Sequence, residues 1–272
     1  MYRKMGSEHI WEELMDLGLK GAIVLITGGS KGLGLACAQA FLAEGARVAI
    51  ASRSHENLEK ARAQLGKVET FAADLCQPRA AADMVDAVER RVGPVDVLVN
   101  SAGAARRIPA EDLTPDAWHS AMEAKYFSYI NVIDPLIKRM AARGRGVIVN
   151  LIGSGGKFAT PTHLGGGAAN AALMLATAGL ANAYAEKGVR VIGINPGPTK
   201  TERVAHGLAA DAKRDGISEA EALQRIVSRM PMKRMPVPEE IADLVVFAAS
   251  VRARLLTGAI LSADAATNPT VV

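Results

Sequence analysis

The chain has little of several features that mark particular classes of protein. It has only two cysteines, Cys37 and Cys76, and their separation fits neither a disulfide framework nor a metal site. Aromatic residues make up 4% of the sequence, and the formal net charge is only +4, with basic residues spread among acidic ones. Such a distribution is typical of a solvated surface and not of a nucleic-acid-binding stripe. We therefore expect no metal, no nucleic-acid partner, and a reducing, cytoplasmic location.

Apolar runs of membrane-spanning length are also missing, and the N-terminus lacks the charged-then-apolar pattern of an export signal. The sequence therefore predicts no membrane partner. Residues 1–18, which include Trp11 and Leu14, are expected to be a peripheral extension, either a short packing helix or a disordered arm.

From residue 19 onward, short apolar runs alternate with segments of helical periodicity. The apolar runs predict strands at 22–26, 47–51, 68–71, 95–99, 146–151, 189–194 and 259–261. The main helical segments lie at about 55–65, 78–92, 115–142, 167–187 and 238–250. Strands that alternate with right-handed helical crossovers predict one α/β domain over residues 19–272. Its fold class would be a doubly wound parallel sheet, a Rossmann fold of about seven strands with helices on both faces.

Residues 199–230 interrupt this alternation with polar, helical sequence. Insertions at the carboxyl ends of the strands lie where an α/β fold binds its ligand. The segment is therefore expected to form a substrate lid.

The most informative motif is the glycine-rich turn Thr27-Gly28-Gly29-Ser30-Lys31-Gly32-Leu33-Gly34. It follows the first apolar run and opens a helical segment, and the apolar run at 47–51 completes a βαβ unit. Glycines let the backbone approach phosphate oxygens, and the free N–H groups of the helix's first turn point at the anion. The turn is thus predicted to hold the diphosphate of a dinucleotide, although without this context it would fit a mobile surface loop.

Further motifs end three of the predicted strands: Asp74-Leu75, Asn100-Ser101-Ala102-Gly103 and Asn195-Pro196-Gly197-Pro198. With the glycine turn, in this order and spacing, they resemble the short-chain dehydrogenase/reductase family over about residues 19–264. The match has departures. Ser101 replaces an asparagine of the family's Asn-Asn-Ala-Gly signature, and Ala263-Asp264-Ala265-Ala266 stands where the family has Val-Asp-Gly-Gly.

The resemblance implies where a nicotinamide dinucleotide would bind. In that family the residue at Asp74 binds the adenine, those at Asn100 to Gly103 line the cofactor, and Thr199 and Thr201 approach the nicotinamide amide. With the glycine turn, the expected cofactor-binding residues are Thr27, Gly28, Ser30, Lys31, Gly32, Leu33, Gly34, Ser52, Arg53, Asp74, Leu75, Asn100, Ala102, Gly103, Pro196, Gly197, Thr199 and Thr201.

The end of the second predicted strand favours NADP(H) over NAD(H). A free ribose 2′-hydroxyl is typically held by an acidic side chain at this point, but the sequence here is Ala51-Ser52-Arg53-Ser54. Arg53 offers a planar fork of donors to a 2′-phosphate, and Lys31 adds a positive charge from the glycine turn. Taken singly, each could be an ordinary surface cation, but their joint placement predicts NADP(H).

The resemblance also implies an Asn-Ser-Tyr-Lys tetrad for proton transfer, with tyrosine and lysine four residues apart on one helix face. None of the tyrosines here has a lysine four residues later: Tyr2, Tyr126, Tyr129 and Tyr184. By alignment, the positions of the asparagine, serine, tyrosine and lysine hold Lys125, Gly153, Gly166 and Asn170. A general acid contributes roughly 10²–10⁴-fold to rate. Ordinary ketone reduction should therefore be impaired unless another group donates the proton.

Three residues are candidate replacements. Lys125 would point into the cleft as an acid, a base or an anion anchor, although an inward cation also suits structural pairing. His163 could donate a proton near neutral pH, or it could simply be an exposed loop residue. Ser154 could still reach a substrate oxygen. The glycines at 165–167 could open a pocket for a larger substrate or only start a helix.

The leading hypothesis is an NADP(H)-dependent oxidoreductase with an altered proton path, acting on a small carbonyl, hydroxyl or enone substrate. Two alternatives stay open: a non-catalytic NADP(H)-binding pseudoenzyme or sensor, and a non-redox lyase, hydrolase or isomerase on the same scaffold. The small-residue-rich segments 115–142 and 167–187 exceed what one sheet face can cover. Together with the resemblance, they predict a homodimer or homotetramer.

Overall fold

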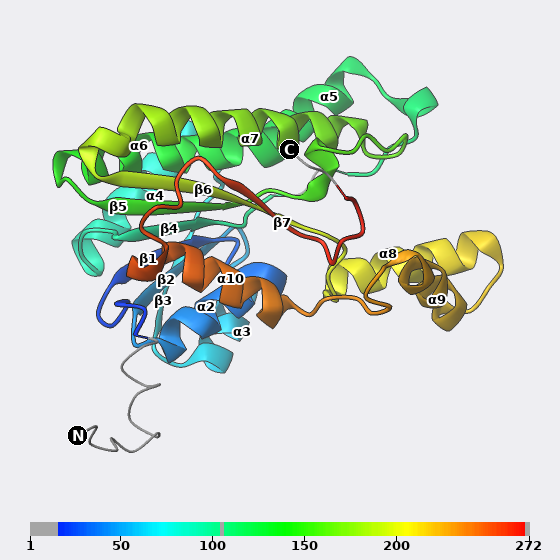
Figure 1. Ribbon diagram of the computed structural model, residues 1–272, viewed down its shortest axis with the longest axis horizontal. Helices are drawn as coiled ribbons and strands as arrows, with labels where there is room; N and C mark the ends of the chain where they lie inside the picture. The colour runs from blue at the N-terminus through cyan, green and yellow to red at the C-terminus, as the bar shows by residue number, and fades with distance from the viewer. Residues whose placement is uncertain (1–15, 104–105, 270–272) are drawn as a thin grey trace, which may run out of the picture.

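The computed structural model describes residues 16–103 and 106–269 (Figure 1). Most of the expected N-terminal extension, residues 1–15, therefore lies outside the described residues. At the centre is one parallel sheet of seven strands in the order β3-β2-β1-β4-β5-β6-β7. The strands are β1 (Ile23–Thr27), β2 (Arg47–Ser52), β3 (Val68–Ala72), β4 (Val97–Asn100), β5 (Gly146–Leu151), β6 (Val189–Pro196) and β7 (Ile260–Ala263).

Helices cover both faces of this sheet (Figure 1). One face packs against α2 (Gly32–Ala43), α3 (His55–Leu65) and α10 (Pro238–Ala249), and the other against α4 (Pro78–Arg91), α6 (Ser128–Ala142) and α7 (Leu164–Tyr184). Because both faces are covered, a strand such as β1 buries every one of its residues. Full burial of one aliphatic side chain contributes about 1.5–3 kcal/mol. The predicted doubly wound parallel sheet is confirmed.

The helical segment predicted at 115–142 has the observed bounds, but it contains an interruption that was not predicted and that affects the site. The structure has α5 (Pro115–Met122), a π-helical turn η2 (Glu123–Phe127), and then α6. A π turn bonds residues five apart and shifts the faces of the helix that follows it. Such turns are frequent at functional sites, and Lys125 is the residue that this one buries.

The expectation that no apolar run reaches membrane-spanning length is wrong for α7. With its 3-10 extension η4 (Ala185–Lys187), it forms a helix of 24 residues that is long and apolar enough by composition. Yet α7 packs along β6 and against α5, and Leu173, Thr177 and Ala181 are buried in the fold. A core helix of a folded domain passes the same test of length and composition, so the match is weak evidence for a membrane span.

The polar segment after β6 forms two helices, α8 (Glu202–Asp215) and α9 (Glu219–Arg229). They lie beside the carboxyl end of β6 and project from the layered body of the molecule (Figure 1). The start of α9 is fixed by a capping box in which Ser218 and Glu221 bond each other's backbone N–H groups. The insertion therefore lies at the edge of the sheet where a ligand of this fold binds.

Candidate active site

A cleft lies at the carboxyl edge of the sheet, where the strand order reverses between β1 and β4. In open α/β sheets, ligands bind in the crevice outside the strand ends at such a point. The cleft has a volume of about 610 Å³. Among the described residues, it is lined by Gly28, Lys31, Gly32, Leu33, Ser101, Ala102, Gly103, Lys125, Leu151, Ile152, Gly153, Pro196, Gly197, Pro198, Thr199, Thr201, Glu202 and Val204.

The glycine turn after β1 is shaped for a diphosphate. A Cβ on Gly28, whose φ is +67°, would lie 2.8 Å from the backbone of Ala102, and a Cβ on Gly34 would lie 2.8 Å from the carbonyl carbon of Gly28. Helix α2 then begins without a side-chain cap from Lys31 and without an acidic residue in its first turn. Its N–H groups and the positive end of its dipole suit an anion, so the residues present fit the expected diphosphate.

Thr27 and Asn100 form the floor beneath the cleft. Thr27 Oγ1 donates to Asn100 Oδ1 at 3.2 Å and accepts the backbone N–H groups of Ser101 and Ala102 at 3.2 and 3.3 Å. Asn100 Nδ2 in turn donates to Asn150 Oδ1 at 3.0 Å. Both Thr27 and Asn100 are fully buried. This satisfied polar network fixes the end of β4 and so positions the loop that lines the cleft.

Of the two cations predicted near the adenosine ribose, Lys31 lines the cleft and Arg53 does not. Arg53 directly follows β2 and is exposed. Lys31 Nζ lies 3.5 Å from Glu202 Oε2 of α8, and both side chains are more than half exposed. An exposed pair of this kind contributes about 0–1 kcal/mol, so a bound phosphate can compete for Lys31. Asp74, expected at the adenine, accepts the backbone N–H of Cys76 at 3.2 Å.

Lys125 enters the cleft from the π-helical turn η2 and is only 8% exposed. Its Nζ donates to the hydroxyl of Tyr129 at 2.8 Å and to the carbonyl oxygen of Leu151, at the end of β5, at 2.9 Å. The Tyr129 hydroxyl donates to the same carbonyl at 2.6 Å. These bonds hold the ammonium group of Lys125 at the inner wall of the cleft. This agrees with the predicted inward orientation of the side chain.

The pairing of Lys125 with Tyr129 was not predicted from the sequence. The motif is Lys-x-x-x-Tyr, the reverse of the family's Tyr-x-x-x-Lys, and its four-residue spacing was the available signal. Tyr129 is fully buried, so its hydroxyl anchors Lys125 and does not face a substrate.

The loop after β5 presents backbone, not a hydroxyl, at the position expected for the serine. Gly153 lines the cleft, and a Cβ there would lie 3.2 Å from Nδ2 of the buried Asn170. Ser154 starts a 3-10 turn, η3 (Ser154–Gly156), and is not among the described residues that line the cleft. A direct role of Ser154 toward a substrate stays a prediction.

His163 immediately precedes α7, and its ring lies between two glycines. A Cβ on Gly166 would lie 2.6 Å from its Nε2, and a Cβ on Gly155 would lie 3.0 Å from its Cδ2. Nδ1 is buried and has no hydrogen-bond partner among the described residues. Burial, together with repulsion by Arg107 and Lys125, lowers the pKa of His163 below its usual 6.5. The residue is therefore half-buried and not a simple exposed loop histidine.

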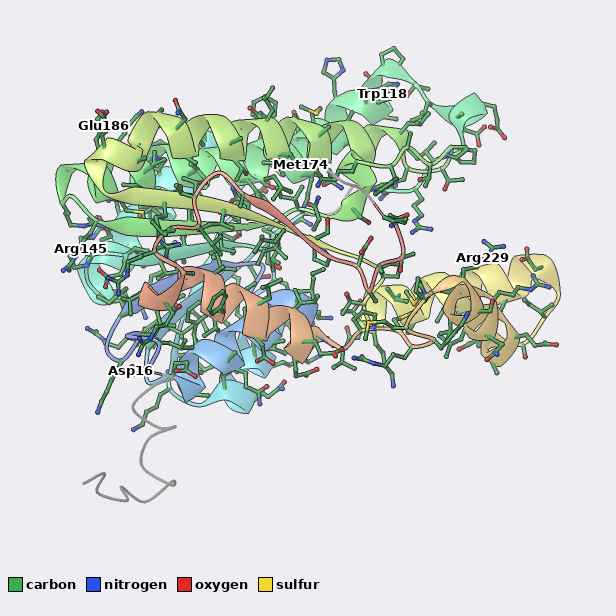
Figure 2. The ribbon with its side chains drawn as sticks, in the orientation of Figure 1. Asp16, Trp118, Arg145, Met174, Glu186 and Arg229 are labelled. Carbon is green, nitrogen blue, oxygen red and sulfur yellow. The ribbon has the colours of Figure 1, made fainter. Side chains whose placement is uncertain are left out.

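The turn after β6 closes the other end of the cleft. A Cβ on Gly197 would lie 2.9 Å from the Cα of Asp264, so the chain needs glycine there. Thr199 lines the cleft and its Oγ1 donates to the carbonyl oxygen of Gly197 at 3.0 Å. Just before this turn, Asn195 Nδ2 at the end of β6 contacts Sδ of Met174 at 3.7 Å, and Met174 belongs to α7 (Figure 2).

The cleft brings many of the predicted cofactor-binding residues together: Gly28, Lys31, Gly32, Leu33, Ala102, Gly103, Pro196, Gly197, Thr199 and Thr201. Other predicted residues lie in the described part of the chain but outside its lining: Thr27, Ser30, Gly34, Ser52, Arg53, Asp74, Leu75, Asn100, Ser154 and His163. The lining also has residues that were not predicted: Leu151, Ile152, Glu202 and Val204. Glu202 and Val204 belong to α8. The polar composition of residues 199–230 was the sequence feature that could have indicated them.

Comparison with known proteins agrees with this geometry. The family model for short chain dehydrogenase matches residues 22–211, more than half of the chain. The chain is 33% identical over 242 residues to an acetoacetyl-CoA reductase of Rhizobium meliloti, covering 89% of this chain and 96% of that protein. It is 34% identical over 253 residues to a D-threitol dehydrogenase of Mycolicibacterium smegmatis, covering 92% and 94%.

A solved structure extends the comparison to three dimensions. The L-sorbose reductase from Gluconobacter frateurii, in complex with NADPH and L-sorbose, superposes with a TM-score of 0.89 at 28% identity, covering 94% of this chain and all of that one. The order of the strands in the sheet, the glycine turn and the sequence identity all indicate the same family. The chain therefore belongs to the short-chain dehydrogenase/reductase family, a family of oxidoreductases that use nicotinamide dinucleotides.

Proposed function

We propose that the chain is an NADP(H)-dependent oxidoreductase that acts on a small hydroxyl, carbonyl or enone compound through an altered proton-transfer site. One observation carries this proposal: a single cleft joins an uncapped, glycine-built helix start to a buried lysine, Lys125. The similarity to a reductase described with NADPH and L-sorbose supports both the cofactor and a small substrate.

The preference for NADP(H) follows from the charges beside the adenosine end of the cleft. The residues that end β2 and follow it, 51–54, include no carboxylate that would repel a 2′-phosphate, and Arg53 offers a guanidinium there. Lys31 is the second cation; unlike Arg53 it lies in the cleft lining, where it pairs with Glu202. A 2′-phosphate would meet Arg53 directly and would compete with Glu202 for Lys31.

Arg53→Asp is expected to raise the Kd of NADPH by about 10- to 100-fold, because a hydrogen bond to a charged group contributes about 1.5–3 kcal/mol. The Kd of NADH should stay the same or fall, since an acidic side chain suits a free 2′-hydroxyl. Fluorescence titration of both nucleotides measures the two constants. Arg62→Asp, an exposed arginine on α3, is the matched control and should leave both unchanged. Equal weakening of NADPH and NADH by Arg53→Asp would argue against this cofactor preference.

When bound, the nicotinamide would supply or accept a hydride at the substrate carbon. The chain's own residues would bind and orient the substrate and handle its proton. Lys125, held by Tyr129 and by the Leu151 carbonyl, would stabilise negative charge on the substrate oxygen from a fixed position. Its low exposure strengthens that interaction, because less water screens the charge. Glu202 and Val204 reach the same cleft from α8, which we propose closes over the substrate as a lid.

A turnover panel tests the proposed function. Purified protein is given saturating NADPH or NADP⁺ with small ketones, sugars, polyols and enones, and nicotinamide absorbance is followed. Turnover of at least one class is the expected result. Saturable nucleotide binding without any absorbance change across the panel would overturn the proposal in favour of a non-catalytic NADP(H) binder. Product formation without net nicotinamide oxidation or reduction would point to non-redox chemistry instead.

We also propose that the chain self-associates through the outer faces of α6 and α7. The sheet takes the face of α7 that carries Leu173, whereas Leu175 on another face is 77% exposed. Glu186 lies just past the carboxyl end of α7, and Trp118 of α5 lies beyond the other end of that helix (Figure 2). A second copy of the chain would cover apolar area here that one molecule leaves in water.

Leu175→Glu is expected to convert a dimer or tetramer into a smaller species, because a carboxylate buried in an apolar interface lacks a partner. Light scattering coupled to size-exclusion chromatography measures the mass directly. Leu255→Glu replaces a leucine that is 92% exposed elsewhere on the molecule and should leave the mass unchanged. A monomeric wild-type protein would refute the proposed interface.

A further inference from the structure

The ring of His163 occupies the space directly over Gly166. A Cβ on Gly166 would lie 2.6 Å from Nε2 and 2.8 Å from Nδ1 of that ring, which is closer than real atoms approach. By sequence alignment, Gly166 stands where the resembled family carries its tyrosine. The imidazole therefore lies where a tyrosine side chain would leave the helix. It fits there because Gly166 has no side chain.

A second feature is an exchange of residue types around this ring. The alignment places Lys125 at the family's asparagine and Asn170 at its lysine. Lys125 lines the cleft from η2, whereas the Asn170 amide is buried on α7, 3.2 Å from where a Cβ of Gly153 would lie. The chain thus keeps one lysine and one asparagine near the site but has moved the positive charge from α7 to the π-helical turn.

The charged groups that act on His163 are both cations. Arg107 comes from the loop after β4 and Lys125 from η2, and each lowers the pKa of the imidazole after the larger effect of burial. Gly155 and Gly166 pack against the ring with backbone only. A half-buried imidazole beside two cations is held in its neutral form near pH 7, ready to accept a proton.

We propose that His163 is the proton acceptor and donor of this enzyme, with its ring over the helix position from which the missing tyrosine would project. The inference rests on the proposed oxidoreductase function and names the group that completes it. In the resembled family a lysine lowers the pKa of the tyrosine. Here a lysine from a different helix acts on a histidine.

The proton and electron balance is as follows. In oxidation, the substrate's carbinol carbon would give a hydride to the oxidised nicotinamide, and its hydroxyl proton would pass to a ring nitrogen of His163. The products are a carbonyl compound, the reduced nicotinamide and an imidazolium that returns its proton to water. In reduction, the imidazolium gives its proton to the carbonyl oxygen as the hydride arrives at carbon. Because one titration of the ring serves both directions, the oxidation rate should level off above the His163 midpoint and the reduction rate should fall above it.

The first test needs neither cofactor nor turnover. The pH midpoint of protonation of the His163 imidazole is measured by NMR titration. Its signal is identified as the one that is lost in His163→Gln. It should lie below that of an exposed histidine, and Lys125→Met should move it upward because a like charge is removed. Lys20→Met, at an exposed lysine remote from the site, is the control and should not move it. A midpoint that Lys125→Met leaves in place would overturn the pairing.

The second test measures whether the ring and Gly166 share one space. Gly166→Ala should lower the unfolding midpoint in the wild-type background and have little effect in the His163→Ala background, where the obstructing ring is gone. Gly179→Ala on the same helix, where a Cβ meets nothing within 4 Å, should not destabilise either background. An equal loss from Gly166→Ala in both backgrounds would contradict the placement of the ring.

With a substrate from the turnover panel, His163→Gln should lower kcat/KM by about 10²–10⁴-fold. In the wild type, the oxidation rate should rise with pH and level off above the His163 midpoint. In Lys125→Met that rise should shift to higher pH, parallel to the NMR midpoint. Full activity in His163→Gln would overturn this inference while leaving the oxidoreductase proposal intact. An inactive wild type would instead refute the proposed function, whatever the NMR midpoints show.

Discussion

Lys125→Met is expected to lower kcat/KM by about 10²–10⁴-fold, the range for loss of a positioned proton-transfer or charge-stabilising group. The reason is the place of its ammonium: 8% exposed, in the cleft lining, and fixed by two hydrogen bonds of 2.8 and 2.9 Å. Steady-state kinetics on a substrate from the turnover panel measures the loss. Nucleotide binding should be weakened far less, because the diphosphate is held by the glycine turn and α2.

Two companion variants separate this effect from general damage. Lys138→Met removes an exposed lysine of α6 that pairs with Asp134, and it should leave kcat/KM unchanged. Tyr129→Phe removes the hydroxyl that accepts a hydrogen bond from Lys125 but keeps the ring, at a stability cost of about 1 kcal/mol. Its kcat/KM should fall between those of the wild type and Lys125→Met. If Lys125→Met retained full activity, the lysine would be only a structural pairing partner.

Gly34→Ala is expected to destroy nucleotide binding and to destabilise the fold by about 1–3 kcal/mol, as overpacking typically does. The added Cβ would meet the backbone carbonyl of Gly28 and lie 3.0 Å from the Cα of Gly29. Backbone cannot move aside as a flexible side chain can, so helix α2 would be pushed away from the turn that holds the diphosphate. Calorimetric titration with NADPH and a thermal unfolding curve report the two effects.

Gly179→Ala provides the comparison for this variant. It makes the same substitution inside a helix, at a position where a Cβ meets nothing within 4 Å. Removing a helical glycine there should stabilise the chain by about 0.5–1 kcal/mol and leave nucleotide binding unchanged. A Gly34→Ala protein that bound NADPH normally would show that the turn does not need the close approach we describe.

The sheet could be predicted from the sequence because parallel strands covered on both faces are short, nearly continuous apolar runs. The strand predicted at 146–151 is observed with those bounds as β5, and helix 55–65 is likewise observed as α3. The glycine turn could also be placed, because its spacing encodes a close backbone approach between Gly28 and Gly34. Local pattern and tertiary structure agree at these elements.

The environment of the catalytic candidates could not be predicted in the same way, because it is assembled from separate segments. The inward orientation of Lys125 was predicted, but the π-helical turn η2 that carries it was not, and neither was its contact with Tyr129. His163 acquires its setting from Gly155 and Arg107, which come from two other segments, and from Gly166, three residues later on the helix that His163 precedes. No spacing rule links Gly155 or Arg107 to His163.

Two other predictions depended on burial that sequence does not reveal. Thr27 and Asn100 have the residue types of a cofactor lining, but the network between β1, β4 and β5 buries them completely beneath it. Lys31 lies in the lining, but the insertion brings Glu202 to it. In each case a distant segment supplies the partner that decides the role.

Calorimetric titration of the wild-type protein with NADPH and with NADH tests the central claim most directly. The account predicts saturable heat with NADPH and a Kd for NADPH at least about tenfold below that for NADH, equivalent to about 1.4 kcal/mol. The absence of heat with either nucleotide, or a lower Kd for NADH, would contradict it.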